Sequence, residues 1–181
     1  CPSKTIRGLR DSTQLSAEER EALAPLIRDR SLAWAVAAVD AFAIDRINIY
    51  QASRFAMKLA VERLVPSCDY LLVDALSLDV SCPQQGLLGG DARCRSLAAA
   101  SILAKVERDA CMAAWDKVFP EFGLARHKGY CTPEHMAALK SFGPTMLHRF
   151  SFEPVRLHSP EAMWTGYPQQ MAMFAASESV A

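Results

Sequence analysis

Apolar and polar residues follow one another along the chain in patterns that predict helices separated by single strands. Ser16 followed by Glu19 can form a capping box, in which each side chain satisfies an unpaired amide, and predicts a helix over about residues 17–30. Pro25 falls inside this helix, and because proline lacks a backbone N–H we expect it to kink or split the helix. The apolar run Leu32–Val39, which contains tryptophan and valines, predicts a buried strand.

The rest of the chain continues this alternation. The pattern predicts an amphipathic helix over about residues 48–65, a strand over 69–74, a short apolar piece over 86–90, a helix over about 96–119 and a short helix between Thr132 and Gly143. The strand over 69–74 has consecutive apolar side chains between two aspartates, which is typical of a strand covered on both faces. Helices that alternate with single strands indicate the α/β fold class.

Composition limits the kind of protein this is. The chain has 181 residues, of which 51% are hydrophobic and 22% charged, enough to bury a core, and we expect one globular domain over residues 1–156 with a tail over 157–181. No apolar run approaches the length of a membrane span, so we expect no membrane partner. Twenty basic and twenty acidic residues give a net charge of zero, so a nucleic acid would have to be held by local patches.

The cysteines indicate the redox compartment, and the first residue raises the question whether the sequence is a fragment. The six cysteines show no Cys-x-x-Cys pair, so we expect reduced thiols, no zinc site and a cytoplasmic protein. Cys1 cannot be a translation start, which leaves a fragment or a mature lipoprotein with an acylated cysteine. A lipoprotein needs a flexible tether, whereas residues 4–10 lead straight into structured-looking sequence, and this favours the fragment.

Two aspartates are the candidates for metal chemistry. Asp74 ends an apolar strand, where ligands bind in open α/β sheets, and Asp91 follows the next short apolar piece. Carboxylates delivered from two strand ends can face each other, and a divalent cation such as Mg²⁺ offsets their repulsion. Asp74 could instead only cap a turn. Asp109 stands four residues after Lys105, and a plain ion pair explains it at least as well as catalysis.

The loop Arg126–Tyr130 combines three side chains that can carry positive charge, a glycine and a tyrosine. Such a loop can grip a phosphate through Lys128 and stack a base or sugar on Tyr130. Charge runs are usually solvated surface, and the loop alone does not decide between the two interpretations.

Taken together and in order, these segments resemble the bacterial ribonuclease HII family over residues 6 to about 156. The matching stretches are Gly8–Ser12, Ile44–Ile49 with Gln51–Ala52, Leu72–Asp74, Gly90–Arg93, Ala98–Val106 with Arg108–Asp109, His127–Tyr130, and His148–Arg149 with Ser151–Phe152. No single stretch decides the matter, but the ordered set is specific.

The resemblance implies a ribonuclease H-like mixed sheet flanked by helices, lacking its first two strands. It implies an endonuclease that cuts the RNA strand of an RNA–DNA hybrid, or cuts duplex DNA at an embedded ribonucleotide, leaving a 5′-phosphate and a 3′-hydroxyl. Asp74 and Asp91 match the third and fourth of the family's catalytic, metal-binding carboxylates, and either Mg²⁺ or Mn²⁺ suits oxygen ligands. Ser12, Asn48 and Gln51 match backbone-phosphate contacts, and Tyr130 matches the aromatic residue that packs against the sugar.

The departures from the family pattern lie mainly at the start of the chain. The family opens with a strand bearing Asp-Glu followed by Gly-Arg-Gly, and the sequence begins after that point. We therefore expect the chain as given to be poorly soluble and catalytically silent at ordinary Mg²⁺ concentrations, and an added N-terminal segment of about 30 residues to rescue both properties. A non-catalytic nucleic-acid-binding remnant of the same fold is the alternative. Ala75, Gly89 and Thr13 also depart from the residues usual at their positions.

The tail carries one further motif. Gln170–Phe174 resembles the short peptides that bind bacterial sliding clamps, with methionine and phenylalanine side chains as anchors in an apolar pocket. Chance apolar residues in an unstructured end are the alternative. We otherwise expect a monomer.

Overall fold

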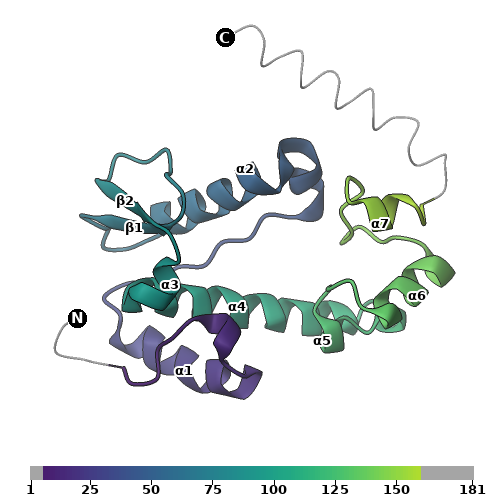
Figure 1. Ribbon diagram of the computed structural model, residues 1–181, viewed down its shortest axis with the longest axis horizontal. Helices are drawn as coiled ribbons and strands as arrows, with labels where there is room; N and C mark the ends of the chain where they lie inside the picture. Colours follow the sequence, from purple (N-terminus) through teal and green to yellow (C-terminus); the bar gives the residue numbers. More distant parts are fainter. Residues whose placement is uncertain (1–5, 160–181) are drawn as a thin grey trace, which may run out of the picture. The chain divides into compact units, whose positions relative to one another are not determined.

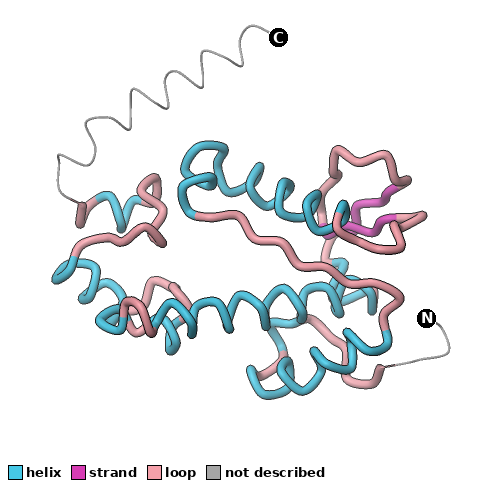
Figure 2. Tube along the Cα trace, turned by 180° about the vertical axis from the view of Figure 1, so that it is seen from behind, coloured by secondary structure: helices cyan, strands magenta, loops and turns pink. Residues whose placement is uncertain are grey.

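The computed structural model describes residues 6–159, and most of them lie in helices (Figures 1 and 2). The elements are η1 (Ser12–Gln14), α1 (Ala17–Arg30), α2 (Ala41–Glu62), β1 (Leu71–Asp74), β2 (Gln84–Leu87), α3 (Gly90–Arg93), α4 (Arg95–Asp116), η2 (Pro120–Phe122), α5 (Leu124–His127), α6 (Pro133–Phe142) and α7 (Glu153–Arg156). The predicted α/β class is confirmed, since helices accompany a small parallel sheet.

The described chain divides into two compact units. The first comprises residues 6–38 and Arg54–Cys111, and the second comprises Val39–Ser53 and residues 112–159. The division falls inside α2 and inside α4, so both units draw on the two longest helices.

The core of the first unit forms between α1 and α4. Its buried members are Leu15, Ala24, Ile27, Ile102 and Leu103. The predicted capping box begins α1: the Glu19 N–H donates to Ser16 Oγ at 3.2 Å, and the Ser16 N–H donates to Glu19 Oε2 at 2.8 Å. The predicted split at Pro25 does not occur, because the neighbours Ala24 and Ile27 are each only 1% exposed and anchor one continuous helix.

The sheet of the first unit pairs β1 with β2 in parallel. The register runs from Leu71 opposite Gln84 to Asp74 opposite Leu87. The Gln84 amide secures the connection between the strands, since Oε1 accepts from the Leu78 N–H and Nε2 donates to the Leu78 carbonyl, each at 2.7 Å. The strand predicted over 69–74 is confirmed, and the apolar piece predicted over 86–90 is divided between β2 and the start of α3.

The buried strand predicted over Leu32–Val39 is wrong. This segment has no strand, and Leu32 is 82% exposed. Trp34 lies under the Arg28 guanidinium, 5.0 Å from ring centroid to Cζ, and the Val36 carbonyl accepts a hydrogen bond from Arg63 at 3.3 Å. Apolar composition favours a strand only where a neighbouring strand supplies ladder hydrogen bonds, and here side chains satisfy the backbone instead.

The second unit has its own core, built from η2, α5, α6 and α7. Its buried members are Phe122, Leu124, Ala138, Leu139 and Val155. The helix predicted between Thr132 and Gly143 is confirmed: Thr132 caps α6, Pro133 is its first residue and the Gly143 N–H bonds the Leu139 carbonyl.

No helix within residues 6–159 is long and apolar enough to cross a membrane. The proposed clamp-binding segment Gln170–Phe174 and Cys1 lie outside the described residues.

Candidate active site

The two aspartates expected to carry the chemistry are linked through Gly90, the residue that precedes Asp91. Asp74 is the last residue of β1, and its Oδ1 accepts from the Gly90 N–H at 3.0 Å. Asp91 follows Gly90 in the first turn of α3, and its Oδ1 accepts from the Ala92 N–H at 2.9 Å. Asp74 is exposed and Asp91 is half-buried. The structure thus brings the two residues together at one end of the strand pair.

The strand register produces this arrangement. Asp74 lies opposite Leu87, and the next residue, Ala75, donates its N–H to the Leu87 carbonyl at 3.0 Å. The chain then turns through Gly89, whose φ of 61° is in the left-handed region, into α3. Ala75 also has a positive φ, of 56°, which costs a residue with a Cβ about 1–2 kcal/mol. The turn after each strand is therefore what directs Asp74 and Asp91 toward the same end.

Gly90 fits this place because it has no side chain. It is buried, and a Cβ there would lie 2.3 Å from Leu97 Cδ1, 3.3 Å from Leu87 Cβ and 3.6 Å from Asp74 Oδ1. A larger residue would force the Leu97 side chain of α4 to move and would crowd Leu87 of β2.

A further carboxylate, Asp11, lies beside Asp91. Asp11 caps η1, and its Oδ1 accepts from the backbone N–H and the hydroxyl of Thr13, each at 2.8 Å. The hydrogen bond from the Thr13 backbone lowers the pKa of Asp11 most, and the bond from the Thr13 hydroxyl comes next. The Asp91 side chain lowers this pKa by a smaller amount. Sequence reasoning did not single out Asp11, because an aspartate that begins a turn has an ordinary structural explanation.

The donor chemistry at this end of the sheet fits a hard divalent cation. Within residues 6–159, no three or more His, Cys, Asp and Glu side chains are grouped so that they could hold a metal ion. Mg²⁺ sites, however, often use one or two carboxylates and complete their octahedron with water and substrate phosphate oxygens. Two carboxylates such as Asp74 and Asp91 would suffice for that smaller protein share.

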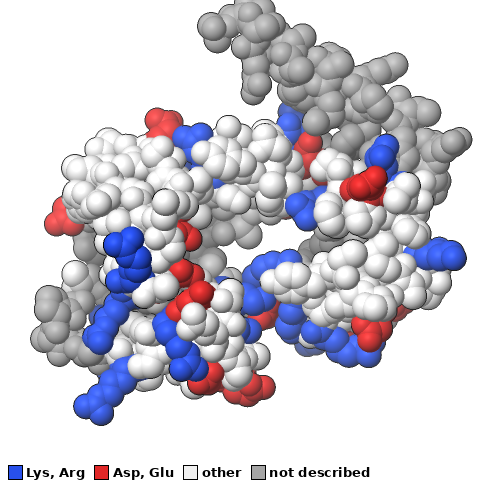
Figure 3. Space-filling model, in the orientation of Figure 1, with Lys and Arg blue, Asp and Glu red and all other residues white. Residues whose placement is uncertain are grey.

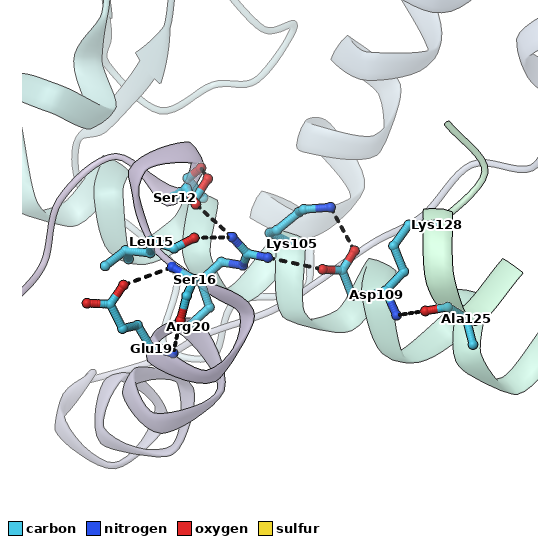
Figure 4. A network of polar contacts seen from close by, with 10 residues as sticks. Ser12, Leu15, Ser16, Glu19, Arg20, Lys105, Asp109, Ala125 and Lys128 are labelled. Carbon is cyan, nitrogen blue, oxygen red and sulfur yellow. Dashed lines mark hydrogen bonds and ion pairs between the residues drawn. The ribbon is translucent and has the colours of Figure 1, made fainter. Parts of the chain in front are cut away.

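A second network supports the loop before α1 (Figure 4). The Arg20 guanidinium donates to the carbonyls of Ser12 and Leu15, at 3.0 and 2.6 Å, and reaches Asp109 Oδ2 at 3.4 Å. Lys105 Nζ donates to Asp109 Oδ1 at 2.7 Å, so the predicted ion pair of Asp109 is confirmed. Arg20 on α1 thus fastens the loop to Asp109 on α4, and Lys105, on α4 itself, holds the Asp109 carboxylate in place.

Ser12 is buried at the centre of that loop. It is 6% exposed, and its Oγ lies 2.7 Å from the Ser101 Oγ on α4. The predicted phosphate contact of Ser12 is compatible with this hydrogen bond, because the Ser12 oxygen can accept from Ser101 while its own O–H donates to the phosphate.

In the second unit, Asn48 and Gln51 lie at a break inside α2. Asn48 has φ 64° and ψ 164°, a conformation that other residues than glycine rarely adopt. Its Oδ1 accepts from the Gln51 N–H at 3.0 Å and so begins the later part of the helix. Both residues are exposed. The helix predicted from about residue 48 therefore begins at this break, and an unpredicted shorter helix precedes it from Ala41, where the Asp40 side chain accepts from the Ala43 N–H.

The loop with Lys128 and Tyr130 follows α5. Lys128 has φ 52°, and its Nζ donates to the Ala125 carbonyl at 2.6 Å. Tyr130 is 62% exposed. Buried His127 holds the turn: its Nδ1 accepts from the Gly129 N–H at 3.2 Å, so its Nε2 carries the proton that is donated to the Phe122 carbonyl at 2.7 Å.

A chain of hydrogen bonds through two more histidines fixes the backbone of Tyr130. The Thr145 N–H donates to His148 Nδ1 at 3.0 Å, which places the proton of His148 on Nε2. That Nε2–H donates to His135 Nε2 at 3.0 Å, and His135 Nδ1–H donates to the Tyr130 carbonyl at 3.0 Å. Each ring is therefore neutral with one donor and one acceptor, and we call this chain the histidine relay.

Burial keeps the histidine relay neutral. Desolvation is the main cause that lowers the pKa of His148 to about 4, and the adjacent His135 lowers it further. Desolvation also lowers the pKa of His135. Sequence reasoning left His148 ambiguous and did not single out His135, because the pairing of two histidines thirteen positions apart is visible only after folding.

Asp45 is a carboxylate that serves the fold. It is 2% exposed, and its oxygens accept from the Phe150 N–H at 2.7 Å, the Ser151 N–H at 3.0 Å and the Ser151 hydroxyl at 2.5 Å. Its only sequence signal was an acid inside an otherwise apolar stretch of helix.

The surface shows no single charged field on the face drawn in Figure 3, where basic side chains are interspersed with acidic ones. This agrees with the net charge of zero, and it leaves recognition of a polyanion to local groups.

Three comparisons with known proteins agree with this geometry. The family model of ribonuclease HII matches residues 3–155. A ribonuclease HII from Solibacter usitatus (strain Ellin6076) is 64% identical over 156 residues, which cover 86% of the chain and 68% of the relative. One from Koribacter versatilis (strain Ellin345) is 48% identical over 178 residues, covering 98% of the chain and 67% of the relative. The chain thus spans about two thirds of the length of these relatives.

Among solved structures, the ribonuclease H2 from Pyrococcus horikoshii OT3 superposes with a TM-score of 0.73. The match covers 87% of the chain and 82% of the archaeal protein. At 21% identity it shows a shared fold.

Proposed function

The chain belongs to the ribonuclease HII family of type 2 ribonuclease H hydrolases, and from this premise we propose that it is an endonuclease acting on RNA joined or paired to DNA. Its substrates are the RNA strand of RNA–DNA hybrids and ribonucleotides embedded in duplex DNA. Hydrolysis breaks the bond between phosphorus and the 3′ oxygen. Water supplies the oxygen that remains on the 5′-phosphate, and a proton ends on the 3′ oxygen.

The observation that carries the proposal is the hydrogen bond from the Gly90 N–H to Asp74 Oδ1, which holds Asp74 next to Asp91. In the proposal Asp74 and Asp91 are the catalytic carboxylates and bind Mg²⁺ or Mn²⁺. When bound, the cation orients the attacking water and offsets charge on the leaving oxygen. The N–H of Gly90 fixes the rotamer of Asp74, so little reorganisation is needed when substrate binds.

Five residues bind the nucleic acid in this proposal. Asn48 and Gln51 are exposed polar side chains at a strained break in a helix, and strain in a polar, exposed residue is a feature of binding sites. Lys128 contacts phosphate, and Tyr130 packs against the sugar that carries the 2′-hydroxyl. Ser12 donates its hydroxyl proton to phosphate while its oxygen accepts from Ser101.

The proposal also covers the compartment, the oligomeric state and a protein partner. The five cysteines described are free thiols, which supports a reducing, cytoplasmic location. We propose a monomer, with Gln170–Phe174 as a sliding-clamp contact. Fluorescence polarisation of a peptide of about 12 residues from this tail against a clamp tests that contact, and absence of saturable binding would end it.

Cleavage of labelled substrates tests the function. The 181-residue chain, and the chain extended by the Asp-Glu and Gly-Arg-Gly segment, are assayed on an RNA–DNA hybrid and on duplex DNA with one ribonucleotide, with Mg²⁺ or Mn²⁺. We expect cleavage by the extended chain, and a cleavage rate reduced by about 100-fold or more in its Asp74→Asn variant. Asp79→Asn is the matched control and should keep the full rate, because Asp79 lies in the connection between β1 and β2 and its side chain is 91% exposed.

Two outcomes contradict this assignment. Full activity of Asp74→Asn removes Asp74 from the mechanism. Saturable hybrid binding by both samples without cleavage in either metal supports the non-catalytic remnant instead.

A further inference from the structure

Two cysteines lie in contact at the start of the sheet of the first unit. The Sγ atoms of Cys68 and Cys82 are 3.4 Å apart, and both side chains are half-buried. The three other described cysteines are arranged differently: Cys94 is half-buried at the end of α3, Cys111 is exposed, and Cys131 contacts the thioether of Met136 at 3.2 Å, a sulfur that cannot form a disulfide. Among residues 6–159, Cys68 and Cys82 are therefore the one pair poised for a sulfur–sulfur bond.

The sheet holds the backbones of both cysteines. Cys68 precedes β1 and Cys82 precedes β2, and the parallel register sets Leu71 opposite Gln84. The Leu71 N–H donates to the Pro83 carbonyl at 2.8 Å, which ties the two strand starts together next to the cysteines. Their proximity thus follows from strand pairing, not from a chance meeting of mobile side chains.

We propose that Cys68 and Cys82 are a reversible thiol–disulfide pair that fastens the starts of β1 and β2. The oxidant is a low-molecular-weight disulfide. One cysteine thiolate attacks it, forms a mixed disulfide and releases one small thiol; the other then attacks the protein sulfur and releases the second. The two protein thiols lose two electrons, the small disulfide gains them, and the two protons pass to the released thiolates.

Burial, followed by the neighbouring Cys68, raises the pKa of the Cys82 thiol. Exchange speeds up as the pH rises, because more of Cys82 is then the thiolate.

The bond would act on stability more than on chemistry. It closes a loop of about 15 residues, which encloses β1, and so restricts the unfolded chain. We expect the oxidised protein to melt about 5–10 °C higher than the reduced protein. Asp74 ends β1 and the cysteines precede its start, so oxidation leaves the carboxylates in place.

Mass spectrometry tests the pair directly. No lysine or arginine lies between Arg63 and Arg93, so one tryptic peptide carries both cysteines and no other. The chain is equilibrated in glutathione buffers from reducing to oxidising, alkylated with N-ethylmaleimide, digested and weighed. In oxidising buffers we expect the peptide to carry neither N-ethylmaleimide adduct and to be two hydrogens lighter than the dithiol peptide. Reduction with dithiothreitol before alkylation should restore both adducts.

Variants separate this bond from general oxidation. In Cys82→Ser, Cys68 should gain only glutathione and the melting shift should vanish, whereas the control Cys111→Ser should retain both. The proposal is overturned if glutathione adducts accumulate on the wild-type peptide without the intrapeptide disulfide at every buffer ratio. It is equally overturned if Cys82→Ser keeps the melting shift.

Discussion

The aspartate side chains of Asp74 and Asp45 differ in exposure and in the number of hydrogen bonds that they accept. Asp45, in the second unit, is 2% exposed and accepts three hydrogen bonds from Phe150 and Ser151. Asp74, in the first unit, is exposed at the end of a strand and accepts one, from the Gly90 N–H. Within residues 6–159, hydrogen bonds from the chain satisfy the first carboxylate, whereas the second accepts the one bond from Gly90 and is exposed to solvent.

This contrast distinguishes a structural acid from a chemical one. A buried carboxylate is tolerated when hydrogen bonds replace its water, and it then holds a loop. A carboxylate that the backbone orients with a single bond keeps both its direction and its acceptor capacity. The difference lies in the number and source of donors, and it leads to opposite expectations for the same substitution.

The largest expected effect comes from exchanging each acid for its amide. Asp45→Asn should lower the free energy of unfolding by about 3 kcal/mol, because one amide N–H must then face a backbone donor. Asp74→Asn should change it by less than about 0.5 kcal/mol, since the site is exposed. Urea unfolding midpoints measure both values. Equal losses in the two variants would erase the distinction.

The histidine relay adds a pH dependence to the stability of the second unit. The pKa of His148 is about 4 in the folded protein and near 6.5 when unfolded, so the unfolded chain binds more protons between these values. Stability is then complete above about pH 6.5 and falls as the pH drops toward 4, by about 2 kcal/mol after allowance for screening.

Denaturant midpoints at a series of pH values measure this slope. His148→Gln should flatten it, whereas His158→Gln, a histidine outside the relay, should leave it unchanged. A slope that persists in His148→Gln would assign the pH dependence to other groups.

Gly90→Ala tests how closely the chain is packed next to Asp74. The new methyl group would meet Leu97 Cδ1 at 2.3 Å and Leu87 Cβ at 3.3 Å, so we expect a loss of about 1–2 kcal/mol and a shifted Asp74. Adding Leu97→Ala removes the closest contact. The double variant should therefore be more stable than the sum of the two single losses implies, and strict additivity would argue against the clash.

The smallest expected effect concerns the residue after Asp74. Ala75 has a φ of 56°, so Ala75→Gly should stabilise the protein by about 0.5–1 kcal/mol, the relief of strain exceeding the added chain entropy. The matched change Ala92→Gly, in helix α3, should destabilise it by a similar amount. Thermal melting of the two variants should shift in opposite directions, and shifts of the same sign would contradict the role of φ.

Local chemistry predicted several elements well. The capping box of Ser16 and Glu19, and the Thr132, Pro133 and Gly143 signals around α6, act within one helical turn and need no distant partner. Asp74 at a strand end and the ion pair of Lys105 with Asp109 were likewise readable from short spacings.

Features that depend on distant partners were missed or misread. The apolar run Leu32–Val39 was predicted as a strand, but strand formation requires a pairing neighbour, and the Val36 carbonyl bonds Arg63 instead. Asp11 and Asp45 carried no distinguishing local signal, because their roles depend on Asp91 and on residues about a hundred positions away.

The order of amino acids alone was enough for the family, because an ordered set of stretches along the chain identifies it. It was also enough for the ends of α1 and α6 and for the acid at the end of β1, since these depend on neighbours within a few residues. Folding decided which carboxylates are buried with hydrogen bonds from the chain and which stay exposed to solvent. It also decided which histidines stay neutral and which cysteines touch. These properties arise from burial and from donors contributed by remote segments, and neither quantity can be read from a local pattern.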